Sequence, residues 1–346
     1  MLKKLYLHHF RNYEEKRLDF FSRNIILCGA NGIGKTNILE AIHYLGILRS
    51  FKNAPVREMV RSGSDAFTLM ALFEDADGEN KIHIEQKKNG ERQCFINDVQ
   101  EKRASAILQN FRSVIFAPED RMLISGTAAV RRRFFDILIS LEDSEYLRDL
   151  QQYKHALAQR NTLLKKNVNS RVVSAIFSSF EELIAFHGER IMQRRAYYAE
   201  LIQNEVRKLS QNDNFSIQYH PDWRNCDLQQ IRCSLEYNRL RDVQKGFTGE
   251  GIQLDDFDMF LDKFNMRSFA SSGQTRIYSL YLKMAEFNLS CTGGRTPIAL
   301  VDDVTGELDE NNRNKFFKML ERAEQTFFTF TEKVDIFEEQ QIISLV

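Results

Sequence analysis

The stretch GANGIGKT, residues 29–36, constrains the fold of this 346-residue chain more than any other feature. Its spacing is G-x-x-x-x-G-K-T, and the apolar run Ile25–Leu27 precedes it. Apolar residues follow it at helical spacing: Ile38, Ile42, Leu45 and Leu48. Strand, glycine-rich loop and helix in this order predict a phosphate-binding loop, because backbone N–H groups and the positive end of the helix then face a triphosphate. A glycine-rich turn that happens to contain Lys is the simpler alternative.

The loop supplies the expected nucleotide contacts. Lys35 is expected to reach the β- and γ-phosphates in a catalytic role, and the Thr36 hydroxyl to ligate Mg²⁺. The predicted ATP-binding residues of the loop are Gly29, Ala30, Asn31, Gly32, Ile33, Gly34, Lys35 and Thr36.

The second half of an ATP site is expected in PIALVDDVTGELD, residues 297–309. Ile298–Val301 predicts a buried strand, with Asp302 at its carboxyl end to hold Mg²⁺. Asp303 follows as the predicted catalytic carboxylate, which would orient the attacking water. Because 266 positions separate Thr36 from Asp302, a compact kinase or GTPase is excluded, and another lobe must be inserted between the two halves.

A second anion site is expected in FASSGQTRIYSLYLKMAEF, residues 269–287. Ser272, Gly273 and Gln274 stand at the start of a helix whose predicted apolar face comprises Ile277, Leu280, Tyr281, Met284 and Ala285. An ordinary helix cap explains the same residues. A second anion site suggests contact with the nucleotide of another copy, with Ser272 in a catalytic role, and the order of the three motifs describes an ABC-type ATPase head that closes as a head-to-tail dimer.

Composition excludes several classes of protein. The chain carries 48 basic and 48 acidic residues, so any contact with nucleic acid must come from local clusters. Five cysteines without a C-x-x-C pair and seven histidines without H-x-x-x-H argue against zinc and disulfide frameworks. The N-terminus turns polar too early for a signal peptide, and no apolar run is long enough to span a membrane. We expect a reduced, cytoplasmic enzyme.

The pattern predicts an α/β fold, in which an ABC-type ATPase head with a mixed sheet carries an inserted α-helical lobe. We expect residues 1–125 and 265–346 in the head and residues 126–264 in the inserted lobe. The head is expected to have an antiparallel portion from residues 1–27 and 67–97, where apolar and polar residues alternate around D-G and N-G turns, and a parallel core around the phosphate-binding loop.

The inserted lobe is expected to contain a short antiparallel helical arm. Residues 140–210 lack Pro and contain a single glycine, Gly188. The expected buried positions are Leu150, Leu157 and Leu164 on the first helix and Ile176, Phe180, Ile184, Ile191, Tyr198, Ile202 and Leu209 on the second. A first helix of roughly 20 residues would span about 30 Å. Two ordinary core helices would give the same pattern.

Three basic clusters are candidates for DNA contact. They comprise Arg49, Lys52, Arg57 and Arg61; Arg131, Arg132 and Arg133; and Arg190, Arg194 and Arg195. A solvated charged face explains each cluster equally well, and Arg131–Arg133 could instead pair with the acidic APED stretch, residues 117–120.

The motifs together resemble the RecF family of bacterial DNA replication and repair ATPases, which is related to the SMC-type ABC heads. The likeness covers nearly the whole chain. It depends on the segments LYLHHFRNY (5–13), GANGIGKTNILEAIHYLGILRSF (29–51), FAPED (116–120), RRRFFD (131–136), SSGQ (271–274) and DDVTGELD (302–309).

The resemblance implies roles for further residues. Arg11 and Asn12 would approach the nucleotide, Ser272 and Gly273 would reach the nucleotide of the partner copy, and Glu307–Asp309 would lie at the dimer seam. Thr329 or Thr331 stands where many ABC ATPases carry a switch histidine. Because Asp303 replaces the glutamate of transport ATPases, the resemblance implies slow hydrolysis.

The resemblance also implies a function. Two copies would close on ATP and Mg²⁺, hold gapped DNA at a junction of single and double strands, and release it on hydrolysis. The implied partners are the mediator proteins RecR and RecO, in support of recombinase loading and the SOS response. The alternatives are an ABC-type subunit of a transporter or of a nuclease, or a scaffold without ATPase activity.

One departure from the family pattern is visible. A Gly-Pro-His-Arg-Asp-Asp stretch usually follows the arm, whereas this chain reads GFTGEGIQLDDFDMF at residues 246–260.

Overall fold

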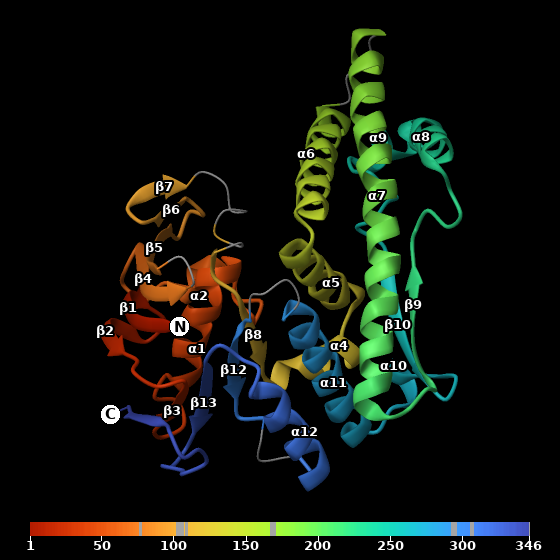
Figure 1. The fold of residues 1–346 in the computed structure, drawn as a ribbon. Coiled ribbons are helices and arrows are strands. Elements are labelled where there is room, and N and C mark those ends of the chain that lie inside the picture. The colour runs from red at the N-terminus through yellow and green to blue at the C-terminus, as the bar shows by residue number, and fades with distance from the viewer. Residues whose placement is uncertain are drawn as a thin grey trace. The chain divides into compact units, whose positions relative to one another are not determined.

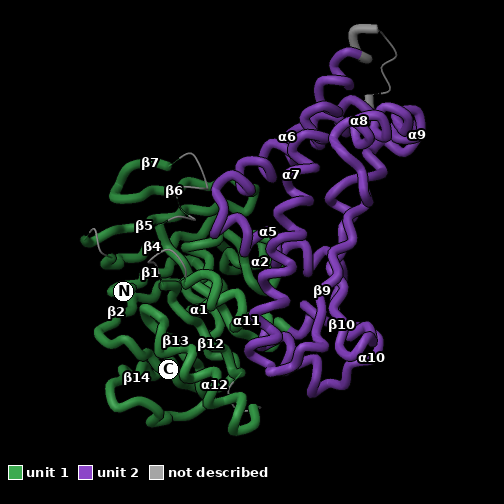
Figure 2. The backbone as a smooth tube through the Cα atoms, turned by 45° about the vertical axis from the view of Figure 1, so that its right-hand side comes forward, with its two compact units in different colours: residues 1–120, 282–346 green, residues 121–281 purple. Residues whose placement is uncertain are grey.

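Three sheets and two long helices organise the described residues of the chain (Figure 1). The computed structural model describes residues 1–75, 78–101, 107, 110–166, 171–291, 296–304 and 308–345. The chain divides into two units: unit 1 comprises Met1–Asp120 and Leu282–Val346, and unit 2 comprises Arg121–Tyr281 (Figure 2). Unit 1 is thus built from both ends of the sequence.

A parallel five-stranded sheet forms one layer of unit 1. Its strands, in spatial order, are β14 (Gln341–Ser344), β3 (Asn24–Cys28), β13 (Thr326–Phe330), β12 (Ile298–Asp302) and β8 (Ser113–Phe116). β3, β12 and β8 are almost entirely buried, as the apolar runs predict. Neighbouring strands come from distant parts of the sequence, since β12 pairs with β8 on one side and β13 on the other.

An antiparallel sheet forms the other layer of unit 1. Its strand order is β2 (Tyr13–Asp19), β1 (Leu2–Phe10), β4 (Ala66–Asp75), β5 (Gly78–Lys87), β6 (Arg92–Ile96) and β7 (Val99–Glu101). Alternating burial along β4 confirms the predicted hairpins. The antiparallel portion ends at Asp19 and not at residue 27, and the antiparallel and parallel strands form two separate sheets.

Helix α1 (Lys35–Ile47) packs against strands of both sheets. The predicted apolar positions Ile38, Ile42, Leu45 and Leu48 are buried, as are the residues of α1 between them. This burial on all sides holds the start of α1 in place at the edge of the parallel sheet. Short helix α2 (Val56–Met59) follows, and α12 (Glu310–Leu320) connects β12 to β13.

Unit 2 is built around a helical hairpin. Helix α5 (Ala128–Glu142) leads into α6 (Ser144–Lys166), and α7 (Arg171–Ser210) returns beside it. The remaining elements are η1 (Pro118–Arg121), α4 (Met122–Ser125), β9 (Phe215–His220), α8 (Leu228–Tyr237), α9 (Arg239–Lys245), β10 (Asp256–Leu261), β11 (Phe264–Asn265), α10 (Met266–Phe269) and α11 (Ser272–Ser290), of which η1 and α11 also extend into unit 1.

Ion pairs along the hairpin establish that its helices are antiparallel. Asp143 pairs with Arg194, Asp149 with Arg190, and Arg160 with Glu181, so the sequence numbers rise on α6 as they fall on α7. Leu150 and Leu164 are buried as predicted. Ile176 is exposed, however, and its neighbour Phe177 is buried in its place.

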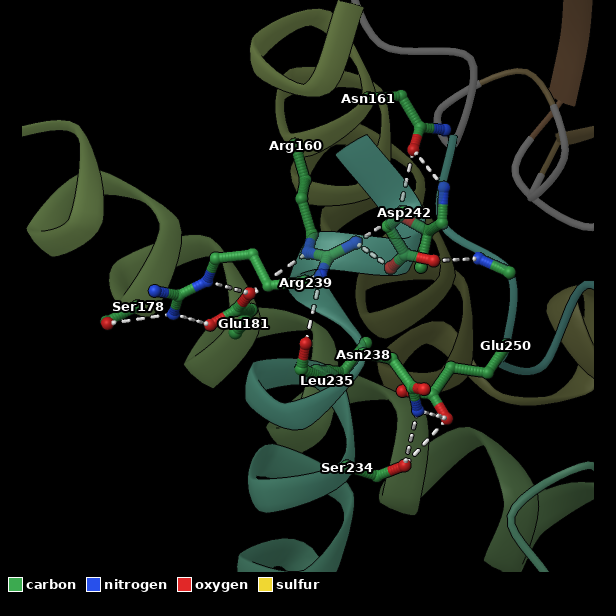
Figure 3. Close-up of polar contacts among 12 residues, drawn as sticks. Arg160, Asn161, Ser178, Glu181, Ser234, Leu235, Asn238, Arg239, Asp242 and Glu250 are labelled. Atoms are coloured by element: carbon green, nitrogen blue, oxygen red, sulfur yellow. Dashed lines mark hydrogen bonds and ion pairs between the residues drawn. The ribbon is translucent and has the colours of Figure 1, made fainter. Parts of the chain in front are cut away.

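A buried polar network anchors the far part of the hairpin to α8 and α9 (Figure 3). The fully buried Arg160 donates to Glu181 and Asp242, with 2.7 Å between its Nη1 and Asp242 Oδ2. It also donates to the Thr248 hydroxyl and the Leu235 carbonyl. Every donor direction of this guanidinium is used, as a buried charge requires.

The boundaries of the units differ from the predicted domains. The first lies after residue 120 and not 125, and the second lies within α11 and not after residue 264. The reason is tertiary: β11 pairs with β10, α10 packs on β10, and Tyr278 of α11 stacks on Phe215 of β9. No helix of the described residues is long and apolar enough to cross a bilayer.

Candidate nucleotide-binding site

A cleft of about 310 Å³ opens at the carboxyl ends of the parallel strands of unit 1. The predicted residues that line it are Asn31, Gly32, Gly34, Lys35, Thr36, Asp302, Asp303, Thr329 and Thr331. Asn37, Lys52, Pro118, Glu119 and Phe330 also line it. The two halves of the predicted ATP site therefore meet, although 266 positions separate them.

The Asp302 carboxylate organises the floor of the cleft. Its Oδ1 accepts from the Thr36 hydroxyl at 2.9 Å and from the Thr329 hydroxyl at 2.8 Å. The Thr329 hydroxyl also accepts from the Asp303 backbone N–H at 3.2 Å. Oxygen ligands from Thr36 and Asp302 suit Mg²⁺, and they lie together here, so these two residues fit the predicted metal site.

The phosphate-binding loop packs closely against neighbouring residues. Gly34 has φ 115°, and a Cβ at this position would lie 2.6 Å from the Tyr13 hydroxyl, so no other residue fits without strain. Lys35 Nζ donates to the Gly29 and Ala30 carbonyls, at 2.6 and 2.9 Å. These bonds close the loop across its own span.

Asp303 is exposed at the cleft and has φ 51°, in the left-handed region. A non-glycine residue with this φ is uncommon, although Asp tolerates it better than most. Backbone strain of this kind concentrates at functional sites. The position is consistent with the catalytic role predicted for Asp303.

Arg11 does not line the cleft. Its Nε and Nη2 form a two-bond ion pair with Glu40, both at 2.7 Å, and its Nη1 donates to the Glu58 carbonyl. Glu40 is fully buried on α1 and also accepts from the Ser50 hydroxyl. The guanidinium is thus held by a buried carboxylate, and the approach of Arg11 to the nucleotide stays a prediction.

Asn12 supports the loop from outside the cleft. Its Nδ2 donates to the Ile33 carbonyl at 3.0 Å, and its Oδ1 accepts from Asn37 Nδ2 at 2.9 Å. Asn12 therefore contacts the phosphate-binding loop, and its approach to the nucleotide stays a prediction.

The FAPED stretch reaches the cleft through Pro118 and Glu119. Asp120 turns back, and its Oδ2 accepts from the Ala117 N–H at 2.7 Å. Burial raises the pKa of Asp120 to about 7, and nearby Lys283 opposes that rise. Lys283 itself pairs with Glu286.

The start of α11 forms a helix cap. Gln274 N donates to the Ser271 hydroxyl at 3.1 Å, and Ser271 N donates to Gln274 Oε1 at 2.9 Å. This is a capping box, so the side chain of Gln274 is already used. Ser272 and Gly273 are exposed in the first turn. Of the predicted seam Glu307–Asp309, Glu307 lies outside the described residues, and Asp309 caps α12 by accepting from Asn312 N.

Two of the predicted DNA contacts are wrong. Arg131 and Arg195 are each 1% exposed. Arg131 forms two bonds with Asp256, and Arg195 pairs with Asp136 and Asp255. These guanidiniums stabilise unit 2. Arg131 pairs with Asp256 and not with the APED stretch, which is the alternative prediction.

The other basic residues fall into three groups. Arg132 donates to the Asp255 carbonyl, Arg194 pairs with Asp143 and Glu145, and Arg133 is half-buried. Lys52 lines the nucleotide cleft. Arg61 pairs with Glu14, and Arg49 and Arg57 are exposed.

The divergent segment 246–260 is held by buried aspartates. Asp255 is fully buried and accepts from Arg195, from the Tyr219 hydroxyl and from Asp222 N. Gln253 accepts from the Tyr153 hydroxyl at 2.6 Å. The Asp-Asp pair that this chain retains is therefore structural.

Comparisons with known proteins agree with the site. The sequence matches the RecF/RecN/SMC N terminal domain family over residues 1–345. The DNA replication and repair protein RecF of Caldanaerobacter subterraneus subsp. tengcongensis is 32% identical over 349 residues, which cover 97% of this chain and 95% of that protein. RecF of Streptococcus pneumoniae is 32% identical, with 95% and 92% coverage.

Solved structures match in the same way. A structure of the recombination mediator protein RecF with ATP, in the RecFOR pathway, has a TM-score of 0.89 at 32% identity and covers 97% of this chain and 93% of that one. A second RecF structure, described as RecF-ATPrS, has a TM-score of 0.84 at 31% identity, with 99% and 96% coverage. The chain belongs to the RecF/RecN/SMC family and, within it, to the DNA replication and repair proteins of the RecF type.

Proposed function

We propose that this chain is an ATP-gated DNA clamp of DNA replication and recombinational repair. ATP and Mg²⁺ bind in the cleft of unit 1, two copies close head to tail on the nucleotides, and hydrolysis opens the dimer. The single observation that carries the proposal is the contact of Thr36 with Asp302, which assembles a Mg²⁺-ATP site from both ends of the chain.

The exposed start of α11 supports dimerisation. The described residues that line the cleft belong to unit 1, whereas Ser272 and Gly273 belong to unit 2. The exposed first turn of α11 carries free N–H groups and a hydroxyl, which suit the γ-phosphate held by another copy.

Slow hydrolysis follows from the side chains available. The shorter Asp303 stands in the place of a glutamate, and no imidazole is found among the described residues that line the cleft. Thr329 is 3% exposed and bonded to Asp302, which leaves Thr331 at the rim. We expect a turnover number below about 1 s⁻¹, against typical enzyme values near 10 s⁻¹.

DNA is the proposed cargo, in gapped form with a junction of single and double strands. Its contacts would come from exposed cations such as Arg49 and Arg57, and not from Arg131 or Arg195. The RecFOR pathway named for the similar structures suggests RecR and RecO as partners, in the cytoplasm, with roles in recombinase loading and the SOS response.

Sedimentation velocity tests the proposal directly. The protein is run with ATP, with ADP and without nucleotide, each with and without gapped duplex. Dimers that form with ATP alone and that retain the DNA would support the clamp. A monomer that ignores both nucleotide and DNA would overturn it.

A further inference from the structure

A second cavity, of about 690 Å³, lies wholly within unit 2. Its volume is in the range of ligand pockets. One wall is a face of α7, and the other is β9 with the bend and turn that follow it. Nothing in the proposed clamp cycle uses this groove.

The two walls run antiparallel. Gln203 of α7 accepts from Ile217 N of β9, whereas Gly188, about four turns earlier on α7, lies against Trp223. Ile217 and Tyr219 lie two positions apart on β9 and face the groove from the same side of the strand, and Trp223 lines it from the bend that follows.

The indole N–H of Trp223 is a hydrogen-bond donor without an acceptor among the described residues. The side chain of Trp223 is 4% exposed, and its indole Nε1–H is buried. A buried donor left unpaired costs on the order of 1–3 kcal/mol, so such groups usually have a partner in the working state. The unpaired indole N–H is therefore a candidate donor to a ligand of the groove.

Gly188 explains why the indole sits there. A Cβ at this position would lie 2.8 Å from Trp223 Cζ3, closer than real side chains approach. The single glycine of the arm thus makes room for the tryptophan ring. Its place within a long helix is otherwise unfavourable by about 1 kcal/mol relative to Ala.

The charge of the groove is acidic. Glu189 and Glu200 line the α7 wall, no Lys or Arg lines either wall, and neither glutamate forms an ion pair with a described residue. Their positions on one face of α7 are eleven residues apart, which corresponds to about 16 Å. Between them Met192, Ala196 and Ala199 line the α7 wall together with Gln193, and Ile217 lies on the wall opposite.

We propose that this groove binds a short extended segment of a partner protein that carries an apolar side chain between two Lys or Arg residues. At about 3.4 Å per residue, the basic residues would stand about five positions apart to reach both glutamates. A main-chain carbonyl of the segment accepts from Trp223. A nucleic acid is disfavoured, because its phosphates would face two unpaired carboxylates.

The groove recognises the side chains of the bound segment, and the segment does not pair with β9 as an additional strand. At the edge of β9, Ile217 N donates to Gln203 and the Phe215 carbonyl accepts from Arg207. Both backbone groups are therefore already satisfied, which blocks pairing with a further strand there.

Selection from a displayed library of random decapeptides tests the proposal. The library is panned against the intact protein and counter-selected against the Glu189→Lys/Glu200→Lys variant. We expect enrichment of peptides with two basic residues about five positions apart and Leu, Ile or Phe between them. Trp223 is the only tryptophan of the chain, so binding of an enriched, tryptophan-free synthetic peptide should shift the fluorescence of the protein.

Matched variants identify the contacts. Glu200→Lys should weaken the synthetic peptide at least tenfold, whereas Glu236→Lys, an equally exposed change on α8, should not. Trp223→Phe, followed by calorimetry, should weaken binding about fivefold, the effect of one lost hydrogen bond. Thermal melting of each variant establishes that it is folded.

Three results would overturn the proposal. They are a selection without enrichment, enriched peptides without basic residues, and binding that persists in the Glu189→Lys/Glu200→Lys variant. A second copy of this chain as the occupant would also contradict it. In that case the same double variant would abolish self-association without nucleotide in sedimentation.

Discussion

At the scale of single residues, Asp302 depends on a neighbour that a motif does not reveal. Thr329 lies opposite Asp302 in the pairing of β12 with β13, and its hydroxyl bonds to the carboxylate. The sequence marks Asp302, because it ends an apolar run. It cannot mark Thr329 as its partner, because the register of two strands distant in sequence is set by tertiary packing.

Replacement of Thr329 tests this role. Thr329→Val keeps the shape and removes the hydroxyl, so the carboxylate loses one of its two fixed bonds. We expect the Mg²⁺ needed for half-maximal ATP binding to rise about three- to tenfold, measured by titration with a fluorescent ATP analogue. Thr331→Val, at the exposed rim, is the matched control, and equal Mg²⁺ dependence in both variants would contradict the role.

The carboxyl of Asp120 is expected to make the stability of the fold depend on pH. Burial raises the pKa of its carboxyl to about 7, despite the opposing influence of Lys283. Between about pH 4 and pH 7 the folded state keeps the proton and the unfolded state loses it, so this group lowers stability as pH rises, by at most about 1.4 kcal/mol per pH unit.

Asp120→Asn should remove that slope, because the amide stays neutral and still accepts from Ala117 N. Urea unfolding at pH 5, 6 and 7 measures it, with the exposed Asp98→Asn as the control. Parallel loss of stability in the Asp120→Asn variant and the unaltered protein would show that Asp120 titrates normally.

At the scale of elements, local patterns predict most of unit 1. The strand, loop and helix around Gly29–Thr36 follow one another directly, so periodicity and glycine spacing suffice. The arm is predicted as two antiparallel helices, and the structure confirms them. What holds the arm is not predicted, because Arg131, Arg160 and Arg195 look like surface cations until their buried carboxylates are known.

The network around Arg160 should dominate the stability of the arm. Arg160→Ala leaves the buried Asp242 without its ion pair and leaves Glu181 paired with Arg239 alone, so we expect a loss of about 3–5 kcal/mol in the free energy of unfolding. Denaturant unfolding followed by far-UV circular dichroism measures this loss.

Arg148→Ala provides the comparison on the same helix. Arg148 is 70% exposed and lies 3.7 Å from Glu145, so the change should cost less than about 1 kcal/mol. Equal losses in the two variants would mean that the Arg160 network adds nothing beyond an ordinary surface pair.

At the scale of the whole molecule, the chain has no net charge, so DNA binding must depend on a small number of exposed cations. Arg49 and Arg57 are exposed, whereas Arg131 and Arg195 are committed to carboxylates. We expect Arg49→Ala/Arg57→Ala to weaken DNA binding with ATP and to reduce the slope of log K against log salt by about 2. Fluorescence anisotropy with labelled gapped duplex measures it, and an unchanged slope would exclude both residues.

The central claim is that each ATP lies between the loop of one copy and the Ser272 turn of another. Lys35→Ala and Ser272→Arg variants should each remain monomeric with ATP in sedimentation velocity. A mixture of the two can build one intact site from the unaltered loop of one copy and the unaltered serine turn of the other, so dimers should appear in the mixture. ATP-dependent dimers of the Ser272→Arg variant alone, or a mixture as monomeric as its components, would contradict the claim.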